Sequence, residues 1–188
     1  LTWRLQVERA GSGALGHIGS HIIDLTQYVT GERIVGVSAT ARTFVPERPL
    51  PEPDGHRTGK VTVDDAVAFL ARFSGGAMGT FEATRMANGR KNALRIEING
   101  SRGSLAFDLE ELNVLRFYDG TAGGEAGFTR ILVTEPEHPY LAGWWPPGHL
   151  LGYEHGFAHQ AADMLNAIAE GTDPEPSFAD GLAVQRVI

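Results

Sequence analysis

The chain contains no cysteine, no long apolar run and no stretch dense in basic residues. Without cysteine, disulfide bonds, zinc–thiolate centres and a cysteine nucleophile are excluded. No apolar segment is long enough to cross a bilayer, and residues 1–30 lack the pattern of a signal peptide. With a formal net charge of −7 and no basic stripe, the sequence indicates neither nucleic acid nor an anionic membrane as a partner.

The remaining composition is typical of a globular protein, with 42% hydrophobic and 9% aromatic residues among 188. This length predicts a single domain over residues 1–188. The chain starts at Leu1 rather than at methionine and ends at Ile188 inside an expected helix. We therefore expect it to be part of a longer, two-domain polypeptide.

The order of the expected elements indicates an α+β fold. A short strand over 2–7 precedes a helix that ends at about Val29, where Gly31 is a natural stop. Alternating apolar residues predict further strands at residues 33–44, 61–73, 77–85, 92–98, 104–107, 112–118 and 128–134. Other segments read as a proline-rich loop over 46–59 and as helices over 150–169 and from Ser177 or Asp180 onward. Strands joined by tight turns pair antiparallel, so we expect one large, open, mostly antiparallel sheet with helices on one face.

One expected strand has an apolar face made by Val67, Phe69, Ala71 and Phe73. A sheet with helices on one side leaves its other side open, and proteins rarely leave a large apolar patch in water. We therefore expect these residues to pack against a second subunit, which gives a homodimer or homotetramer through the sheet.

Two histidines stand out in the first expected helix. His17 and His21 are four residues apart, so a regular helix would place both imidazoles on one face. A placed pair of histidines indicates proton transfer or metal binding, whereas the alternative is two polar side chains at a solvent edge. His17 lies nearer to the positive end of the helix dipole, where a cation is disfavoured, so we expect it to stay largely neutral.

The glycines at residues 11–16 match the dinucleotide-binding pattern GxGxxG. That fingerprint requires a buried parallel strand before it and a βαβ unit around it. The preceding residues 3–9 are half polar, and the following strands read as hairpins. We therefore expect no nucleotide site here, and glycines that open a helix close to another backbone or a ligand.

A second group of polar residues lies on the expected helix over 150–169. His155, His159 and Asp163 are spaced four apart and could present three metal ligands on one face, although hydrogen bonding at a domain edge is an equal alternative. The carboxylate pairs Asp64–Asp65 and Glu110–Glu111 are expected to be solvated.

Two adjacent indoles, Trp144 and Trp145, lie in a loop stiffened by prolines. Indoles are costly to leave in water, so they serve either as core or as the wall of a pocket. With a histidine and a tyrosine nearby, their flat faces suit the apolar side of a polyhydroxylated ring.

Several short motifs are spread over most of the chain: SGALGHIGSHIIDL (12–25), FEATR (81–85), RIEINGS (95–101), GSL (103–105) and YEH (153–155). Together they resemble the glucose–fructose oxidoreductase/inositol dehydrogenase (Gfo/Idh/MocA) family. Members of that family have an N-terminal Rossmann domain for NAD(P) and a C-terminal α/β domain with a large open sheet. The resemblance implies that this chain is the C-terminal domain alone. NAD or NADP would then be bound mainly by a domain that this chain does not contain.

The resemblance also implies candidate site residues. In the family, the first helix of this domain carries an Asp and, four residues later, a His that exchanges a proton with the substrate oxygen. His21 matches that His, whereas His17 stands where the family has Asp. The implied protein is a cytoplasmic NAD(P)-dependent oxidoreductase acting on a sugar, cyclitol or related polyol, and the isolated chain would be inactive. Further candidates for the substrate pocket are Arg4, Trp144, Trp145, His149 and Tyr153.

Two alternatives stay open. The departure at His17 favours a non-catalytic relative that senses a sugar or nucleotide and uses its sheet for protein interaction. A metal-dependent sugar isomerase or hydrolase would instead use His155, His159 and Asp163.

Overall fold

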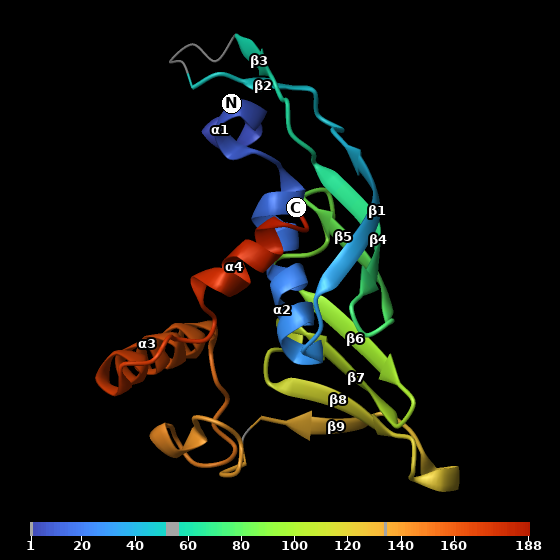
Figure 1. Ribbon diagram of the computed structural model, residues 1–188, viewed down its shortest axis with the longest axis vertical. Coiled ribbons are helices and arrows are strands. Elements are labelled where there is room, and N and C mark those ends of the chain that lie inside the picture. Colours follow the sequence, from blue (N-terminus) through green and yellow to red (C-terminus); the bar gives the residue numbers. More distant parts are fainter. Residues whose placement is uncertain (1, 52–56, 134) are drawn as a thin grey trace. The chain divides into compact units, whose positions relative to one another are not determined.

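The computed structural model describes residues 2–51, 57–133 and 135–188, which form two compact units (Figure 1). The first unit comprises the chain up to Gly89 together with Phe178–Ile188, and the second is Arg90–Ser177. The expected α+β class is confirmed, and the described strands pair antiparallel. Their hydrogen bonds form three sheets instead of one large sheet, because residues 85–94 interrupt the pairing. The single domain over residues 1–188 stays a prediction.

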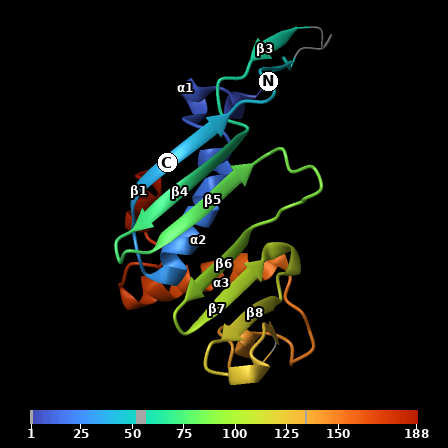
Figure 2. The same ribbon diagram turned by 90° about the vertical axis from the view of Figure 1, so that its right-hand side faces the viewer.

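The first unit is built on a three-stranded sheet with helices against one face (Figure 2). The strand order is β1-β4-β5, with the bounds β1 Ile34–Arg42, β4 Ala66–Phe73 and β5 Met78–Thr84. The covering helices are α2, Ser20–Thr30, and α4, Phe178–Gln185. Ile23 of α2 and Val184 of α4 join the strand residues in one buried cluster. Tight apolar packing of this kind is what holds a small unit together.

The apolar face of β4 is the core of this unit. Val67, Phe69, Ala71 and Phe73 are 1–6% exposed, and Phe69 stacks on Phe81 of β5 with ring centroids 4.6 Å apart. The prediction that these four residues pack against a second subunit is therefore wrong. Their alternation marked an apolar face correctly, but helices α2 and α4 cover that face.

The expected strand over 2–7 is replaced by two short helical turns, η1 (Trp3–Leu5) and α1 (Val7–Ala10). Thr62 holds this segment, because its backbone N–H donates to the Leu5 carbonyl at 3.1 Å and its hydroxyl accepts from the Val7 N–H at 2.8 Å. An alternating pattern this short does not require a strand, because neighbouring segments decide its backbone conformation.

The expected proline-rich loop over 46–59 contains a small hairpin. Strand β2 (Glu47–Pro49) pairs with β3 (Thr58–Lys60), while residues 52–56 lie outside the described part of the chain.

The second unit contains a four-stranded meander and a long helix. Its strands are β6 Arg95–Gly100, β7 Gly103–Asp108, β8 Val114–Asp119 and β9 Thr129–Leu132. Helix α3 spans Tyr153–Glu170. The side-chain amide of Asn113 holds the segment before α3, since it donates to and accepts from the Leu151 backbone at 2.8 Å each. None of the described helices is long and apolar enough to span a membrane.

Candidate functional site

The two central histidines lie at an irregular helix start. Residues Leu15–Gly19 form a wide π-helical turn, η2, which carries His17, and the regular helix α2 begins at Ser20, directly before His21. Gly31 ends α2 with a φ of 68°, as the sequence predicts. We expected His17 and His21 to lie on a regular α-helix, but the structure has a π turn followed by an α turn at these two residues. Single π turns within helices are frequent at functional sites.

Asp64 holds this helix start. Its carboxylate accepts from the backbone N–H of Gly13 at 2.6 Å and of Leu15 at 2.8 Å, and its carbonyl accepts from the N–H of Ala14 at 3.0 Å. A side chain at Gly13 would overlap the Asp64 backbone, which explains why a glycine stands there. The prediction that Asp64–Asp65 is solvated is therefore wrong for Asp64, because local sequence does not reveal a contact about fifty residues away.

The same contacts test whether residues 11–16 fit a dinucleotide. A pyrophosphate binds at a helix start through the backbone N–H groups that have no partner in the helix. Here Asp64 accepts from three successive N–H groups, and its negative charge repels a phosphate. The loop does not fit a dinucleotide phosphate, in agreement with the prediction that residues 11–16 form no nucleotide site.

We therefore expect this 188-residue chain to bind no nicotinamide nucleotide tightly. Titration with NADH and with NADPH, followed by nucleotide fluorescence, should show no saturable change at micromolar concentration. Saturable binding that Asp64→Ala strengthens would contradict this expectation, because it would place the phosphate at the helix start.

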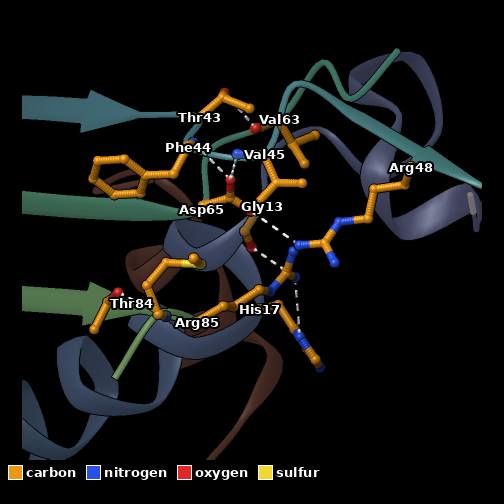
Figure 3. Close-up of polar contacts among 11 residues, drawn as sticks. Gly13, His17, Thr43, Phe44, Val45, Arg48, Val63, Asp65, Thr84 and Arg85 are labelled. Carbon is orange, nitrogen blue, oxygen red and sulfur yellow. Dashed lines mark hydrogen bonds and ion pairs between the residues drawn. The ribbon is translucent and has the colours of Figure 1, made fainter. Parts of the chain in front are cut away.

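Asp65 is fully buried beside the same helix start (Figure 3). Its Oδ2 accepts from the backbone N–H groups of Phe44 at 2.7 Å and Val45 at 2.9 Å, and its carbonyl accepts from the Arg85 N–H at 2.9 Å. Arg48 Nη2 lies 3.9 Å from Oδ1, within ion-pair distance but too far for a hydrogen bond. The expectation of a solvated Asp65 is wrong, because its carboxylate holds the segment after β1 while its backbone carbonyl holds Arg85, directly after β5. By contrast, Glu110–Glu111 is exposed, as the sequence predicts.

Arg85 connects the end of β5 to the candidate site (Figure 3). Its Nη2 donates to the Gly13 carbonyl at 3.3 Å and contacts His17 Nδ1, also at 3.3 Å. A guanidinium has only donors, so in this contact His17 Nδ1 accepts and the proton of the neutral imidazole is on Nε2. Arg85 thus selects one tautomer of His17 and leaves its Nε2–H available to a ligand.

The surroundings of His17 favour its neutral form. Partial burial lowers the pKa of His17 first, and the positive charges of Arg85, Arg4 and His21 lower this pKa further. The direction is the one expected from the sequence, but burial and neighbouring cations are its causes rather than the helix dipole alone. The contributions of Arg4 and His21 also show that the structure brings these two sequence candidates close to His17.

We expect the imidazole of His17 to titrate below its ordinary pKa of about 6.5. Because this pKa is lower in the folded state, the folded chain binds fewer protons than the unfolded chain once the pH falls below about 6.5. Folding stability therefore decreases as the pH falls through this range. A proton NMR titration of the His17 ring should show the low midpoint, and Arg85→Gln should raise it by removing a neighbouring charge. Arg42→Gln, on an exposed arginine of β1, should leave it unchanged; a midpoint indifferent to Arg85→Gln would contradict this account.

The remaining candidates lie in the second unit, where Trp144 is held against α3. Its Nε1–H donates to His159 Nε2 at 2.6 Å, and its ring lies edge-on to His155 with centroids 4.3 Å apart. Tyr140 stacks on His159 at 4.2 Å and donates its hydroxyl to Asp163 at 2.8 Å. These contacts form an aromatic cluster that fixes the loop before α3 to the helix.

The same cluster uses the atoms that a metal would need. His159 Nε2 accepts from Trp144, Asp163 accepts from Tyr140, and His155 Nδ1 accepts from the Gly152 N–H at 2.9 Å. Within residues 2–51, 57–133 and 135–188, no three histidine or carboxylate side chains are arranged to hold a metal ion. The hydrogen-bonding interpretation of this helix face is therefore the one that the geometry favours.

The other pocket candidates of this unit are exposed. Trp145 is 72% exposed and lies near His149, with ring centroids 6.0 Å apart, while Tyr153 is 60% exposed and packs edge-on against Phe157. Exposed aromatic rings in a short segment can provide the apolar contact surface of a sugar site. Their role as pocket residues stays a prediction.

Comparison with known proteins identifies the family. The family model for the GFO/IDH/MocA C-terminal domain matches residues 1–106, more than half of the chain. The chain belongs to the Gfo/Idh/MocA family. The resemblance read from the motifs is thereby confirmed, as is the assignment to the C-terminal domain.

Curated relatives and solved structures match almost the whole chain. The levoglucosan dehydrogenase of Pseudarthrobacter phenanthrenivorans is 40% identical over 98% of this chain and 50% of its own length. Among solved structures, an oxidoreductase domain protein from Kribbella flavida is 67% identical with a TM-score of 0.94, covering 100% of this chain and 50% of that one. A levoglucosan dehydrogenase in complex with NADH and L-sorbose is 43% identical with a TM-score of 0.91, covering 98% and 49%. The chain thus spans about half the length of these relatives.

Sequence reasoning missed two residues of this Gfo/Idh/MocA domain that hold the candidate site. Asp64 fixes the helix start and Arg85 fixes the tautomer of His17. Arg85 lies in the FEATR motif that carried the resemblance, so the motif itself was the available signal. Asp64 had no signal, because its partners are distant in sequence and the pair Asp64–Asp65 resembles any solvated turn.

Proposed function

We propose that this chain is the substrate-binding domain of an NAD(P)-dependent oxidoreductase that oxidises a sugar, cyclitol or related polyol. Family membership and the relative that binds NADH and L-sorbose support the reaction class. The observation that carries the proposal is the state of His21. Its side chain is exposed in the first turn of α2 and makes no hydrogen bond with any residue in the described part of the chain, so both ring nitrogens are available to a substrate.

The proposed chemistry separates a proton from a hydride. Bound mainly by a domain that this chain does not contain, NAD(P) would supply the oxidation by taking up a hydride, with its two electrons, from the substrate carbon. His21 accepts the proton of the hydroxyl group on that carbon, and a carbonyl group forms. An imidazole suits this role because its neutral and protonated forms are both accessible near neutral pH.

His17 has a different proposed role. Its pKa is lowered by partial burial and by Arg85, so the ring stays neutral while it donates a hydrogen bond from Nε2 to a substrate oxygen. Arg4 lies near it in η1. We also propose Trp144, Trp145, His149 and Tyr153 as residues that contact a sugar ring.

The proposed reaction is tested on the full-length protein that contains this chain. Purified protein is incubated with NAD or NADP and a panel of sugars, cyclitols and acyclic polyols, and formation of reduced nicotinamide is followed by absorbance. We expect turnover with at least one polyol. The non-catalytic alternative predicts ligand binding without turnover in every combination, together with activity that appears in His17→Asp.

We also propose that the protein assembles as a homodimer or homotetramer through the sheet, on the face of β1-β4-β5 opposite to α2. Pairing places Ser38, Thr40, Ala68, Leu70 and Thr80 on that face. Arg72 and Glu82 lie on the same face, whereas the residues directly opposite Leu70, which is 52% exposed, are the small Ser38 and Thr80 and allow close approach of a second sheet there. Sedimentation should give an oligomeric mass that Leu70→Arg reduces, whereas a monomeric wild-type mass at micromolar concentration would exclude the assembly. The cytoplasmic location stays a prediction.

A further inference from the structure

The side chains around His17 carry an excess of positive charge. Arg85 contacts His17 directly, and the charges of Arg4 and His21 both act on the His17 ring. Within the described residues, no carboxylate lies within ion-pair distance of the Arg85 or Arg4 guanidinium. Asp64, the acidic residue that contacts this helix start, already accepts from the backbone N–H groups of Gly13 and Leu15.

The hydrogen-bonding capacity of this cluster consists of donors. Nη2 of Arg85 donates to Gly13 and His17, but the N–H groups on its Nε and Nη1 donate to no described residue. The Nε2–H of His17 has no described acceptor either. Arg4 lies over the Trp3 ring, 5.4 Å from its centroid, which leaves the guanidinium edge to solvent. A ligand at this place meets donors and positive charge together.

We propose that His17, Arg85 and Arg4 bind a carboxylate of the substrate, so that the preferred substrate is an acidic sugar or polyol such as a hexuronate or an aldonate. This inference rests on the proposed oxidation of a polyol at His21. A neutral hydroxyl group can also accept from these donors, but it brings no negative charge to the two guanidinium groups. A carboxylate accepts from the same donors and supplies one negative charge, and an Arg85 N–H on Nε or Nη1, which donates to no described residue, can donate to one of its oxygens.

The location of the cluster supports a role in binding. His17 and Arg4 are exposed, and Arg85 is half-buried, with its backbone N–H held by the Asp65 carbonyl. The guanidinium is therefore anchored by β5 and by the Gly13 carbonyl before any ligand arrives. An anchored donor loses less conformational freedom on binding than a flexible surface arginine.

The test compares acids with their neutral amides in the full-length protein. D-glucuronate is paired with D-glucuronamide, D-galacturonate with D-galacturonamide, and D-gluconate with D-gluconamide, which changes the charge with little change in shape. We expect kcat/KM to be at least about tenfold higher for the acid in the pair that is turned over, the scale of one hydrogen bond to a charged group. Arg85→Gln should remove this preference and Arg85→Lys should retain part of it, whereas Arg42→Gln, at an exposed arginine of β1, should leave it unchanged.

The outcomes separate this inference from the proposed function. If the neutral member is preferred in every pair, or if Arg85→Gln lowers kcat/KM equally for both members, the carboxylate site is refuted while the oxidation stands. If no compound is oxidised, the proposed function fails. The carboxylate site is then tested by itself, by measuring the binding of the same acids by calorimetry. Binding that is weakened about tenfold by Arg85→Gln supports the site, and absence of binding refutes it.

Discussion

His21→Ala should lower kcat of the full-length protein by about a hundredfold or more, the usual scale for loss of a general acid–base group. The reason is that the exposed imidazole of His21 has no partner among the described residues and is the proposed acceptor of the substrate proton. The measurement is steady-state turnover with the best polyol from the panel at saturating nucleotide. KM should change much less than kcat, because the ring is proposed to act on the proton rather than to hold the substrate.

Two control variants make this result specific. His138→Ala removes a histidine of the second unit that has no proposed role in the site, whose Nδ1 accepts from the Glu135 N–H at 3.2 Å, and should leave kcat nearly unchanged. His17→Asp restores the residue that the family has at this position and should retain or raise turnover of a neutral polyol, since Arg85 can pair with a carboxylate there; the same pairing should remove any preference for an acidic substrate. Unchanged turnover in His21→Ala would remove the catalytic assignment.

Asp65→Ala should destabilise the chain by about 2–4 kcal/mol, the cost of leaving two partly buried N–H groups without an acceptor. Asp65 is 0% exposed, and its Oδ2 accepts from the N–H groups of Phe44 and Val45. Denaturant unfolding followed by circular dichroism measures the loss directly. Asp65→Asn keeps one oxygen of the same shape and should lose less than Asp65→Ala.

Asp119 provides the matched control for Asp65. Its carboxylate also accepts two hydrogen bonds, both from Thr121, but the residue is exposed at the end of β8. Water can replace these bonds, so Asp119→Ala should change the unfolding midpoint little. Equal effects of Asp65→Ala and Asp119→Ala would mean that burial does not determine the role of Asp65.

The regular elements of this chain could be predicted from the sequence because their patterns are long and local. The stop of α2 at Gly31 needs only one residue with a positive φ, and β4 alternates over eight residues. The short segment 2–7 has no such length, so a single contact with Thr62 is enough to turn it into helical turns. Alternation in β4 identified an apolar face, but only the placement of α2 and α4 decides what covers that face.

The candidate site also has residues that the sequence reveals and residues that only the structure reveals. His17 and His21 could be found because four-residue spacing and motif resemblance are both visible in the sequence. Asp64 and Arg85 are brought to the helix start by strands β4 and β5, and their contacts span about fifty to seventy residues. No local property of an aspartate or an arginine reports such a contact, so their part in the site follows only from the structure.

The most direct test of the central claim is the fate of substrate hydrogen in the full-length protein. A polyol that is oxidised in the panel is prepared with deuterium on its carbons and incubated with the preferred nucleotide, and the products are examined by NMR and mass spectrometry. Hydride transfer predicts one deuterium on the reduced nicotinamide ring and no deuterium from the reacting carbon in water. In His21→Ala, the signals of the labelled nicotinamide and of the carbonyl product should decrease by the same factor. Deuterium released from the reacting carbon into water, without label on the nicotinamide, would contradict the proposed oxidation.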